Sequence, residues 1–336
     1  MSGIALIWAA IAVPLAWILL AIVERIAPTG FLNAHMREQP TGTTPVRQLG
    51  GFAVVPLYLA GLALTARHQP GEWRFLTALG GATALLWLVG MADDHRHLSA
   101  HLRLMAHFLA AIAVVLTLPT SLALFDGLVP VWVERMAIVF GLVYGINATN
   151  FMDGMDLMSV AGLGIPICAG ALLLAGSGAS IPIAFASLVM AAALVGFTPF
   201  NLPPARLYLG DNGALPLGLA AGIACVLLAF ETNLIAAVLP FGYYLADSAS
   251  TLALRALRGE NIFRSHSGHA YQVARKAGRS VWWVVAVVVV ANTLLALTAA
   301  YAAGTGDVGA LIGAAVVGVA ISAGVVVFFR RQGRTG

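Results

Sequence analysis

Long apolar stretches alternate with short polar ones along the whole chain. Eleven of these stretches are continuously apolar and do not alternate residue by residue, which favours membrane-spanning helices over the strands of a barrel. A helix needs about 20 apolar residues to cross a bilayer. The stretches cover residues 3–23, 50–66, 75–92, 104–118, 131–147, 158–176, 180–198, 213–230, 233–255, 281–302 and 308–329. The pattern predicts an all-α polytopic membrane protein with about eleven transmembrane helices.

The composition supports the same class. Hydrophobic residues make up 60% of the 336 residues and charged residues only 10%, whereas a soluble domain is about 25% charged. Too little polar surface is available to cover a soluble core, and the two cysteines lie inside apolar stretches, so a disulfide scaffold is also excluded. We expect a single integral membrane domain over residues 1–336. Its first stretch lacks the features of a cleaved signal peptide and is expected to remain as a span.

Positive charge is distributed unevenly between the two sides of the predicted bundle. Of the 18 Lys and Arg residues, 15 follow an odd-numbered apolar stretch, and the other three are Arg67, Arg74 and Arg135. Cytoplasmic loops of membrane proteins are enriched in Lys and Arg. We therefore expect the N-terminus outside and the C-terminus in the cytoplasm. The same rule explains the net charge of +4, so we expect no nucleic-acid partner.

Residues able to carry chemistry gather on the predicted cytoplasmic side. They lie in loops at about 24–49, 93–103, 147–157, 199–212 and 256–280, which we expect to form one active site. Several carboxylates and no cysteine ligands favour a hard cation, which would be Mg²⁺ or Mn²⁺. Arginines and histidines nearby would donate hydrogen bonds to phosphate oxygens. The set indicates transfer between a phosphorylated substrate and a lipid acceptor.

Four motifs in these loops resemble those of one family. Residues 90–99, which contain Asp93 and Asp94, resemble the aspartate-pair motif of the polyprenyl-phosphate N-acetylhexosamine-1-phosphate transferases. Residues 147–156 are similar to the second motif of this family, and residues 201–211 are similar to its third. In the last loops, residues 244–247, 258–260 and 266–272 are similar to its fourth. The resemblance covers about residues 1–280 and is nearest to bacterial glycosyltransferase family 4 enzymes. The chain is less similar to the phospho-N-acetylmuramoyl-pentapeptide transferases, and Leu157 stands where glycine is common.

The resemblance implies an enzyme of the bacterial inner membrane. It would transfer a sugar-1-phosphate, of the N-acetylhexosamine type, from a UDP-sugar to undecaprenyl phosphate and release UMP. This is the initiating step of a surface glycan such as O-antigen. The implied partners are the UDP-sugar, undecaprenyl phosphate and the lipid bilayer. The oligomeric state stays open, with a homodimer as one alternative.

The resemblance also implies roles for individual residues. Asp211 and Asp94 would bind Mg²⁺, and Asp93 would orient or deprotonate the lipid phosphate, so these three form the predicted catalytic set. The remaining predicted residues would bind substrate: Arg47, Asn150, Asp153, Asp156, Arg206, Asp247, Arg264, His266 and His269. Among them, the histidines with Arg206 and Arg264 would hold phosphates, and Asn150 with Asp153 would contact the nucleotide or sugar.

Several alternatives remain open at this stage. Asp211 could cap the helix that follows it, and Asp153 with Asp156 could be a charge pair on one helix face. Asp247 could pair with Arg255 or Arg258. The spacing of His266 and His269 also allows a zinc site. For the whole chain, the alternative function is a transporter or lipid flippase, which would place ionisable groups along a path through the membrane.

Overall fold

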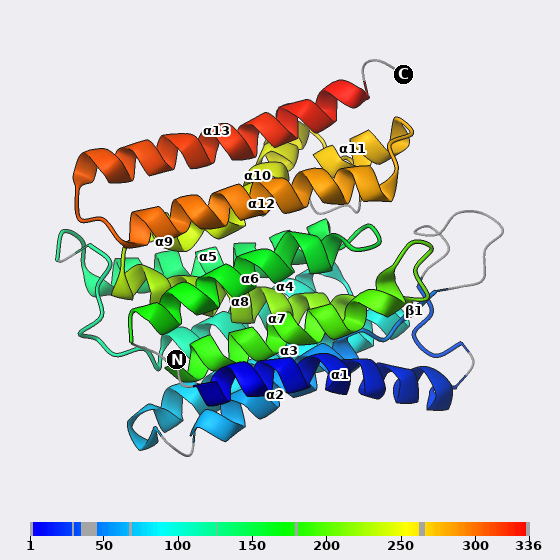
Figure 1. Ribbon diagram of the computed structural model, residues 1–336, viewed down its shortest axis with the longest axis horizontal. Helices are drawn as coiled ribbons and strands as arrows, with labels where there is room; N and C mark the ends of the chain where they lie inside the picture. The colour runs from blue at the N-terminus through cyan, green and yellow to red at the C-terminus, as the bar shows by residue number, and fades with distance from the viewer. Residues whose placement is uncertain are drawn as a thin grey trace.

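The computed structural model describes residues 3–28, 30–34, 46–66, 69–125, 127–178, 181–261 and 266–333. Helices run side by side along the long axis of the molecule (Figure 1). In chain order the longer helices are α1 (Gly3–Ile26), α2 (Gly51–Ala66), α3 (Trp73–Arg96), α4 (Ala100–Val115), α5 (Val131–Met152), α6 (Met158–Gly176), α7 (Ile181–Asn201), α8 (Asp211–Glu231), α10 (Gly242–Leu257), α12 (Val281–Ala303) and α13 (Val308–Gln332). The short helices are η1 (Pro70–Glu72), α9 (Leu234–Val238), η2 (Leu239–Phe241) and α11 (Ala270–Lys276).

Every predicted apolar stretch contains helix, and the fold class is confirmed as all-α and polytopic. Among the described residues, eight helices are long and apolar enough to cross a membrane: α1, α3, α5, α6, α7, α8, α12 and α13. Helices α2 and α4 are apolar but have only 16 residues each. The ninth stretch, predicted as one span, is broken into α9, η2 and α10. The expected number of eleven transmembrane helices therefore stays a prediction.

Helices α7 and α8 form the centre of the bundle, and 78% of the residues in the most apolar segment of each are buried. Helix α7 packs against α1, α2 and α6, while α8 packs against α3, α5 and α6. Glycines allow the close approach of α8 to α5, because a Cβ atom at Gly218 would lie 2.7 Å from the Cα of Ile146. Helices α1 and α13 lie on the outside, where apolar side chains face outward along their length.

A polar contact within the bundle joins α12 to α6. Pro166 lies inside α6 and has no N–H to donate to the carbonyl of Gly162, four residues earlier. The side chain of Asn292 in α12 supplies the missing donor, since its Nδ2 lies 3.1 Å from the Gly162 oxygen and 3.2 Å from that of Ala161. Asn292 is 1% exposed, so this bond satisfies a group that neither water nor lipid reaches.

One end of the bundle carries most of the polar structure. There β1 (Arg47–Gln48) pairs in parallel with β2 (Leu207–Tyr208), and α11 packs against α13. Figure 1 shows β1, α11 and the C-terminus at the same end of the molecule, on the right of the view. The predicted motif loops therefore meet at one end. Which side of a membrane this end faces remains the expectation from the charge distribution.

Candidate active site

Asp94 holds the beginning of α8. Its Oδ1 accepts the N–H of Asp211 at 2.9 Å, and its Oδ2 accepts the N–H and the side-chain amide of Asn212 at 3.0 and 2.6 Å. The first N–H groups of a helix have no partner within the helix, and a carboxylate placed there also interacts favourably with the helix dipole. Asp94 is 5% exposed. Its contacts therefore fix the position and direction of Asp211, the first residue of α8.

Asp93 faces a different set of partners from Asp94, because successive helical residues are about 100° apart. Its Oδ1 accepts the N–H of Leu98 at 2.6 Å, and its Oδ2 accepts Nη1 of Arg103 at 2.8 Å. The same Nη1 lies 3.4 Å from Oδ2 of Asp211, and Nδ2 of Asn150 donates to the other Asp211 oxygen at 2.5 Å. Arg103 thus bridges carboxylates from α3 and α8. This group of Asp93, Arg103, Asn150 and Asp211 is called the aspartate cluster below.

The segment between α5 and α6 is not helical, so Asp153 and Asp156 do not share a helix face, and the charge-pair alternative does not apply. Asp153 accepts a hydrogen bond from the hydroxyl of Ser159, and Asp156 accepts the N–H of Ala205 at 3.2 Å. Burial raises the pKa of Asp156, and the bond from Ala205 opposes the rise. Leu157 adopts a φ of 63°, in the left-handed region that glycine enters without strain.

Asn201 joins this segment to β2. Its Oδ1 accepts the N–H of Leu157 at 2.7 Å, and its Nδ2 donates to the carbonyl of Leu207 at 2.9 Å. Asn201 is 4% exposed. The second and third motif loops are therefore held together by a buried amide that binds the backbone of both.

Asp247 is the second buried carboxylate that holds a helix, and it is 0% exposed. It accepts the N–H groups of Ala270 and Tyr271, at 2.8 and 3.4 Å, and the hydroxyl of Tyr243 at 3.1 Å. These contacts fix the beginning of α11. Because the carboxylate is enclosed by protein groups, its position argues for a positioning role in place of the predicted direct contact with substrate. Its alternative partner, Arg255, donates instead to Glu260 at 2.8 Å.

The two histidines of the last motif lie beside this helix start. Nδ1 of His269 is 3.5 Å from Oδ1 of Asp247. The rings of His266 and His269 are stacked with centroids 4.9 Å apart, and Phe151 at the end of α5 stacks on His269 at 6.0 Å. The hydroxyl of Tyr271 donates to the carbonyl of Phe151 at 3.3 Å. His266, His269 and Phe151 are called the histidine cluster below. This cluster joins α11 to the same loop that carries Asp153.

His266 is arranged to be a neutral donor. Burial, followed by the neighbouring His269 and Arg255, lowers its pKa to about 4. Its Nδ1 lies 3.2 Å from the N–H of Gly268 and accepts from it. In a neutral imidazole that accepts at one nitrogen, the proton sits on the other. His266 therefore presents Nε2–H near neutral pH.

The three predicted arginines have different positions. Arg47 donates through Nη2 to the carbonyl of Glu24 at 2.7 Å, at the end of α1. Arg206 is exposed, lies over the ring of Phe200 with 5.0 Å between guanidinium carbon and ring centroid, and is 3.6 Å from the Glu24 carboxylate. Arg264 lies outside the described residues. The contacts of Arg47 argue that it satisfies backbone carbonyls at the end of α1, in place of the predicted contact with substrate.

The donor set suits a magnesium ion that shares its shell with phosphates. Mg²⁺ is usually held by one or two carboxylates together with substrate oxygens, and no group of three or more His, Cys, Asp or Glu residues in the described ranges is arranged to hold a metal. The side chain of Asp211 is 20% exposed, compared with 6% for Asp93. Asp211 therefore fits such an ion. Asp94 directs both oxygens at α8, and its predicted metal role has no support from this geometry.

The position of Asp211 settles the alternative that this residue caps α8. The residue that precedes α8 is Gly210, with a φ of 75°, so Asp211 is the first helical residue and not the cap. Asp94 supplies the capping oxygens instead. A Cβ atom at Gly210 would lie 2.8 Å from an Asp94 oxygen, so the glycine also makes room for this contact.

Sequence reasoning missed the central place of Arg103 and the roles of Asn201 and Asn212. Arg103 lies at the end of the predicted loop 93–103 but is not among the predicted site residues. Its position near the start of α4, ten residues after Asp93, was the available signal, because a helix that returns from α3 brings its first turn beside the end of α3. Nothing in the local sequence indicates that Asn212 donates to Asp94 and to the carbonyl of Gln48.

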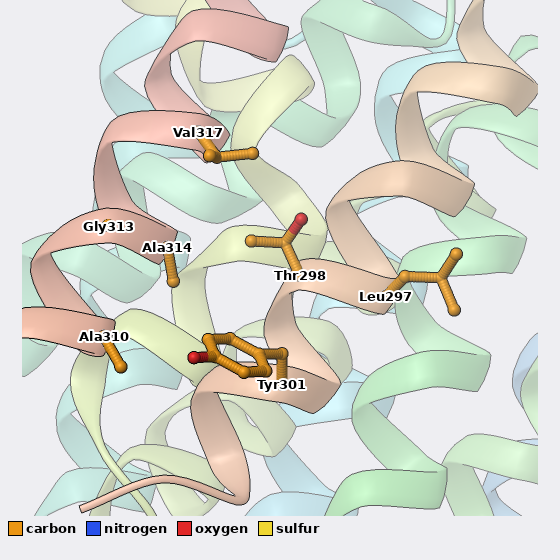
Figure 2. A pocket seen from close by; sticks show the side chains of 7 residues that line it. All are labelled: Leu297, Thr298, Tyr301, Ala310, Gly313, Ala314 and Val317. Atoms are coloured by element: carbon orange, nitrogen blue, oxygen red, sulfur yellow. The ribbon is translucent and has the colours of Figure 1, made fainter. Parts of the chain in front are cut away.

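A surface groove elsewhere on the molecule is not part of this site. It lies between α12 and α13 at the end of the pair that is remote from α11, and Figure 2 shows its apolar lining around Tyr301 and Thr298. The chemistry-bearing residues described above are all absent from its walls. Its composition is that expected of a helix pair facing lipid.

Helices of spanning length throughout the described residues make the chain a multi-pass membrane protein. Comparisons with known proteins are more specific. The family model "Glycosyl transferase family 4" matches residues 76–229, which include the whole aspartate cluster. The matched family model and the names of the relatives support a polyprenyl-phosphate hexosamine-1-phosphate transferase family for this chain.

Individual relatives carry names that fit this family. A "Probable undecaprenyl-phosphate N-acetylglucosaminyl 1-phosphate transferase" of Bacillus subtilis (strain 168) is 26% identical over 84% of this chain and 80% of its own length. The decaprenyl-phosphate N-acetylglucosaminephosphotransferase of Mycolicibacterium smegmatis is 30% identical over 57% of this chain and 52% of its own. A phospho-N-acetylmuramoyl-pentapeptide-transferase of Shouchella clausii is 32% identical over 51% of each. The chain thus matches only about half the length of the last two relatives.

Proposed function

We propose that this protein transfers a sugar-1-phosphate, of the N-acetylhexosamine type, from a UDP-sugar to undecaprenyl phosphate and releases UMP. The observation that carries the proposal is the aspartate cluster, in which Arg103 joins Asp93 to Asp211 at the polar end of the bundle. The names of the relatives support the polyprenyl-phosphate acceptor and the amino-sugar phosphate. The alternative of a transporter or flippase is not favoured by the family.

The proposed reaction joins two anions. An oxygen of the lipid phosphate forms a new bond to the β-phosphorus of the UDP-sugar, and the bond between this phosphorus and the bridging oxygen breaks. The bridging oxygen leaves with UMP. A phosphate monoester has a second pKa near 6, so the attacking group is already largely ionised near pH 7. Holding the anions together and in line is therefore the main task of the protein.

The aspartate cluster is suited to that task. Asp211 would hold Mg²⁺, with the rest of the ion's shell supplied by the diphosphate; when bound, the ion neutralises charge on the diphosphate and on the leaving UMP. Arg103 lies beside Asp211 and supplies a fixed positive charge next to the same position. Asp93, held by Arg103 and the N–H of Leu98, would orient the lipid phosphate.

The remaining site residues divide between binding and support. Nε2–H of His266 and the imidazole of His269 would donate to phosphate oxygens, and the exposed Arg206 would add positive charge. Asn150 would orient Asp211, to which it already donates. Asp153 and Asp156 border the same loop and would contact the nucleotide or sugar, whereas Asp94 and Asp247 would act by positioning helices.

We further propose that the site faces the cytoplasm of a bacterial inner membrane and that the product starts a surface glycan, such as O-antigen or a cell-wall polymer. The charge distribution supports this orientation. In a background lacking Cys168 and Cys225, Gly304→Cys should be labelled by an impermeant thiol reagent added to intact cells, and Leu98→Cys should not. The opposite labelling would reverse the orientation and remove access of the site to cytoplasmic nucleotides.

The central experiment measures UMP release by the purified full chain with undecaprenyl phosphate and a panel of UDP-sugars. EDTA should abolish release and Mg²⁺ should restore it. Asp211→Asn should lower the rate by roughly 10²–10³, as for the loss of one preorganised electrostatic contact, and excess Mg²⁺ should restore part of it. Asp93→Asn should not respond to Mg²⁺. Undiminished release in EDTA or in Asp211→Asn would refute the proposed site, and release that requires an ion gradient would favour a transporter.

A further inference from the structure

Helix α13 is connected to the histidine cluster by two hydrogen bonds and one longer polar contact. Nη2 of Arg330, near the end of α13, donates to the hydroxyl of Thr251 at 2.7 Å. That hydroxyl lies 3.2 Å from Oδ1 of Asp247. The same Oδ1 accepts the N–H of Ala270 and lies 3.5 Å from Nδ1 of His269. A path of three contacts therefore leads from α13 to a proposed phosphate-binding side chain.

The direction of these bonds is fixed by their chemistry. A guanidinium group has donors and no acceptor, so the Thr251 oxygen must accept from Arg330. The single hydroxyl proton of Thr251 is then free to point at Asp247. A threonine within a helix often donates instead to the backbone carbonyl four residues earlier. Arg330 thus selects the hydroxyl orientation that adds a donor to the carboxylate holding α11.

Apolar contacts support the same end of α13. Phe329 is 0% exposed and meets the ring of Tyr243 edge to face with 6.2 Å between centroids. The hydroxyl of Tyr243 is itself a donor to Asp247. Beyond α11, Arg279 donates to the side-chain oxygen of Gln332 at 2.9 Å through Nε. Helix α13 therefore supports both the start and the end of the segment that carries α11.

We propose that Arg330 is a positioning residue for the histidine cluster, acting through Thr251 and Asp247 on the start of α11. This inference rests on the proposed function only in taking His269 as a substrate-binding residue. It gives a role to a helix outside the matched family region of residues 76–229. Arg330 touches neither the aspartate cluster nor its surroundings in any contact described above, so its effect should be on binding and not on the metal.

The experiment compares two adjacent arginines in the full-length protein in detergent. Arg330→Met keeps an apolar stem for packing and removes the donors, whereas Arg331→Met changes an exposed neighbour. Arg330→Met should raise KM for the UDP-sugar about threefold, in the lower part of the range for one hydrogen bond, with a smaller change in kcat. Arg330→Lys should recover part of the loss. Arg331→Met should behave as the wild type.

A second variant tests the path itself. Thr251→Val removes the middle contact with little change of shape, and Arg330→Met added to it should have no further effect on KM, because both changes break one chain. A purely structural role would instead reduce the folded fraction and kcat and leave KM unchanged. Additive effects of the two changes, or equal effects of Arg330→Met and Arg331→Met, would overturn the proposal.

Hydrogen exchange provides a readout that does not depend on activity. Backbone amides of residues 269–276 should exchange faster in Arg330→Met than in Arg331→Met, since the support of the α11 start is weakened. Unchanged exchange would overturn the positioning role whatever the kinetics. Faster exchange in a protein that releases no UMP from any UDP-sugar would instead sustain the role of Arg330 and refute the proposed function.

Discussion

The two ends of the active-site region, at α8 and at α11, are built in the same way and used differently. Each helix begins against a buried carboxylate from a distant part of the chain: Asp94 accepts two N–H groups of α8, and Asp247 accepts two of α11. In α8 the first residue held is Asp211, the proposed metal-binding carboxylate. In α11 the held residues follow His269, so the carboxylate acts on a side chain that lies just before the helix.

The surroundings of the two carboxylates explain why their loss should have different consequences. Asp94 lies next to the charges of the aspartate cluster, where a small displacement of Asp211 changes the position of the reacting phosphates. Asp247 lies among the hydroxyls of Tyr243 and Thr251, which can retain part of the arrangement when the carboxylate is altered. The comparison teaches that a helix start held by a remote carboxylate can position either a catalytic group or a binding group.

Among substitutions that alter a helix start, the largest effect is expected for Asp94→Asn. The substituted amide cannot accept at both positions, so at least one buried N–H of α8 loses its partner, at a cost of about 1–3 kcal/mol in stability. The accompanying displacement of Asp211 should lower kcat by roughly 10²-fold, as small misplacements do. UMP release measured over a wide range of Mg²⁺ concentration checks this. Rescue by Mg²⁺ would show that Asp94 is a metal ligand after all.

A matched control for Asp94 lies outside the active-site region. Glu134 is 1% exposed and accepts the N–H groups of Leu124 and Phe125, both at 3.0 Å. Glu134→Gln should destabilise the protein by a similar amount without changing kcat per folded molecule. An equal loss of kcat in Glu134→Gln would mean that the Asp94 effect reports only general destabilisation.

A smaller effect is expected for Asp247→Asn. The loss of a helix-capping group costs about 1 kcal/mol, and the displaced His269 should raise KM for the UDP-sugar about fivefold, the equivalent of one hydrogen bond. The dependence on Mg²⁺ should be unchanged. Steady-state kinetics at varied UDP-sugar separate the two parameters. A loss of kcat as large as that of Asp94→Asn would remove the distinction between the two helix starts.

The sequence was sufficient to predict where the helices lie and which loops meet. Continuous apolar stretches marked the helices because lipid allows no other regular exposed structure apart from a closed barrel. The alternation of sides then brought Asp93, Asp94 and Asp211 to one end. The break in the ninth stretch was missed, because hydropathy does not register the turn at Pro240 or the close contact of Gly242 with Ser322 of α13.

The division of roles between neighbouring residues could not be predicted, because it depends on partners far away in the chain. The Asp94 contact to Asp211 spans 117 residues, and nothing local decides which of two adjacent aspartates faces α8. Leu157 is a second example. Its departure from the usual glycine was visible in the sequence, but the left-handed backbone that explains the preference, and the bond from its N–H to Asn201, required the structure.

A still smaller effect is expected for His266→Gln, which sharpens the description of the histidine cluster. The His266 pKa of about 4 lies below the usual value of about 6.5, so protonation favours the unfolded protein, and acidification below about pH 6.5 lowers stability. Near neutral pH the ring is a neutral donor, which a glutamine amide can partly replace. The substitution should lower kcat/KM about threefold to fivefold, less than one full hydrogen bond.

The pH profile distinguishes a neutral donor from a cation at this position. Between about pH 6 and 8.5, wild type and His266→Gln should give parallel profiles of kcat/KM, which reports ionisations of the free enzyme. If His266 bound phosphate as an imidazolium ion, wild-type activity would fall as the pH rises through this range and the variant would not follow it. Such a difference would contradict the neutral assignment.

The smallest effect on activity is expected for Arg47, where a third helix end is held by a distant side chain. Here the polarity is reversed: a guanidinium donates to the Glu24 carbonyl at 2.7 Å and to that of Ala27 at 3.4 Å, groups at the end of α1 that lack partners within the helix. Arg47→Met should cost about 1 kcal/mol in stability and leave kcat and KM for the UDP-sugar unchanged. Thermal unfolding in detergent and steady-state kinetics measure the two quantities on the same preparation. A large rise in KM without loss of stability would show that Arg47 reaches the substrate, as the resemblance implied, and that only carboxylates hold helices at this end of the molecule.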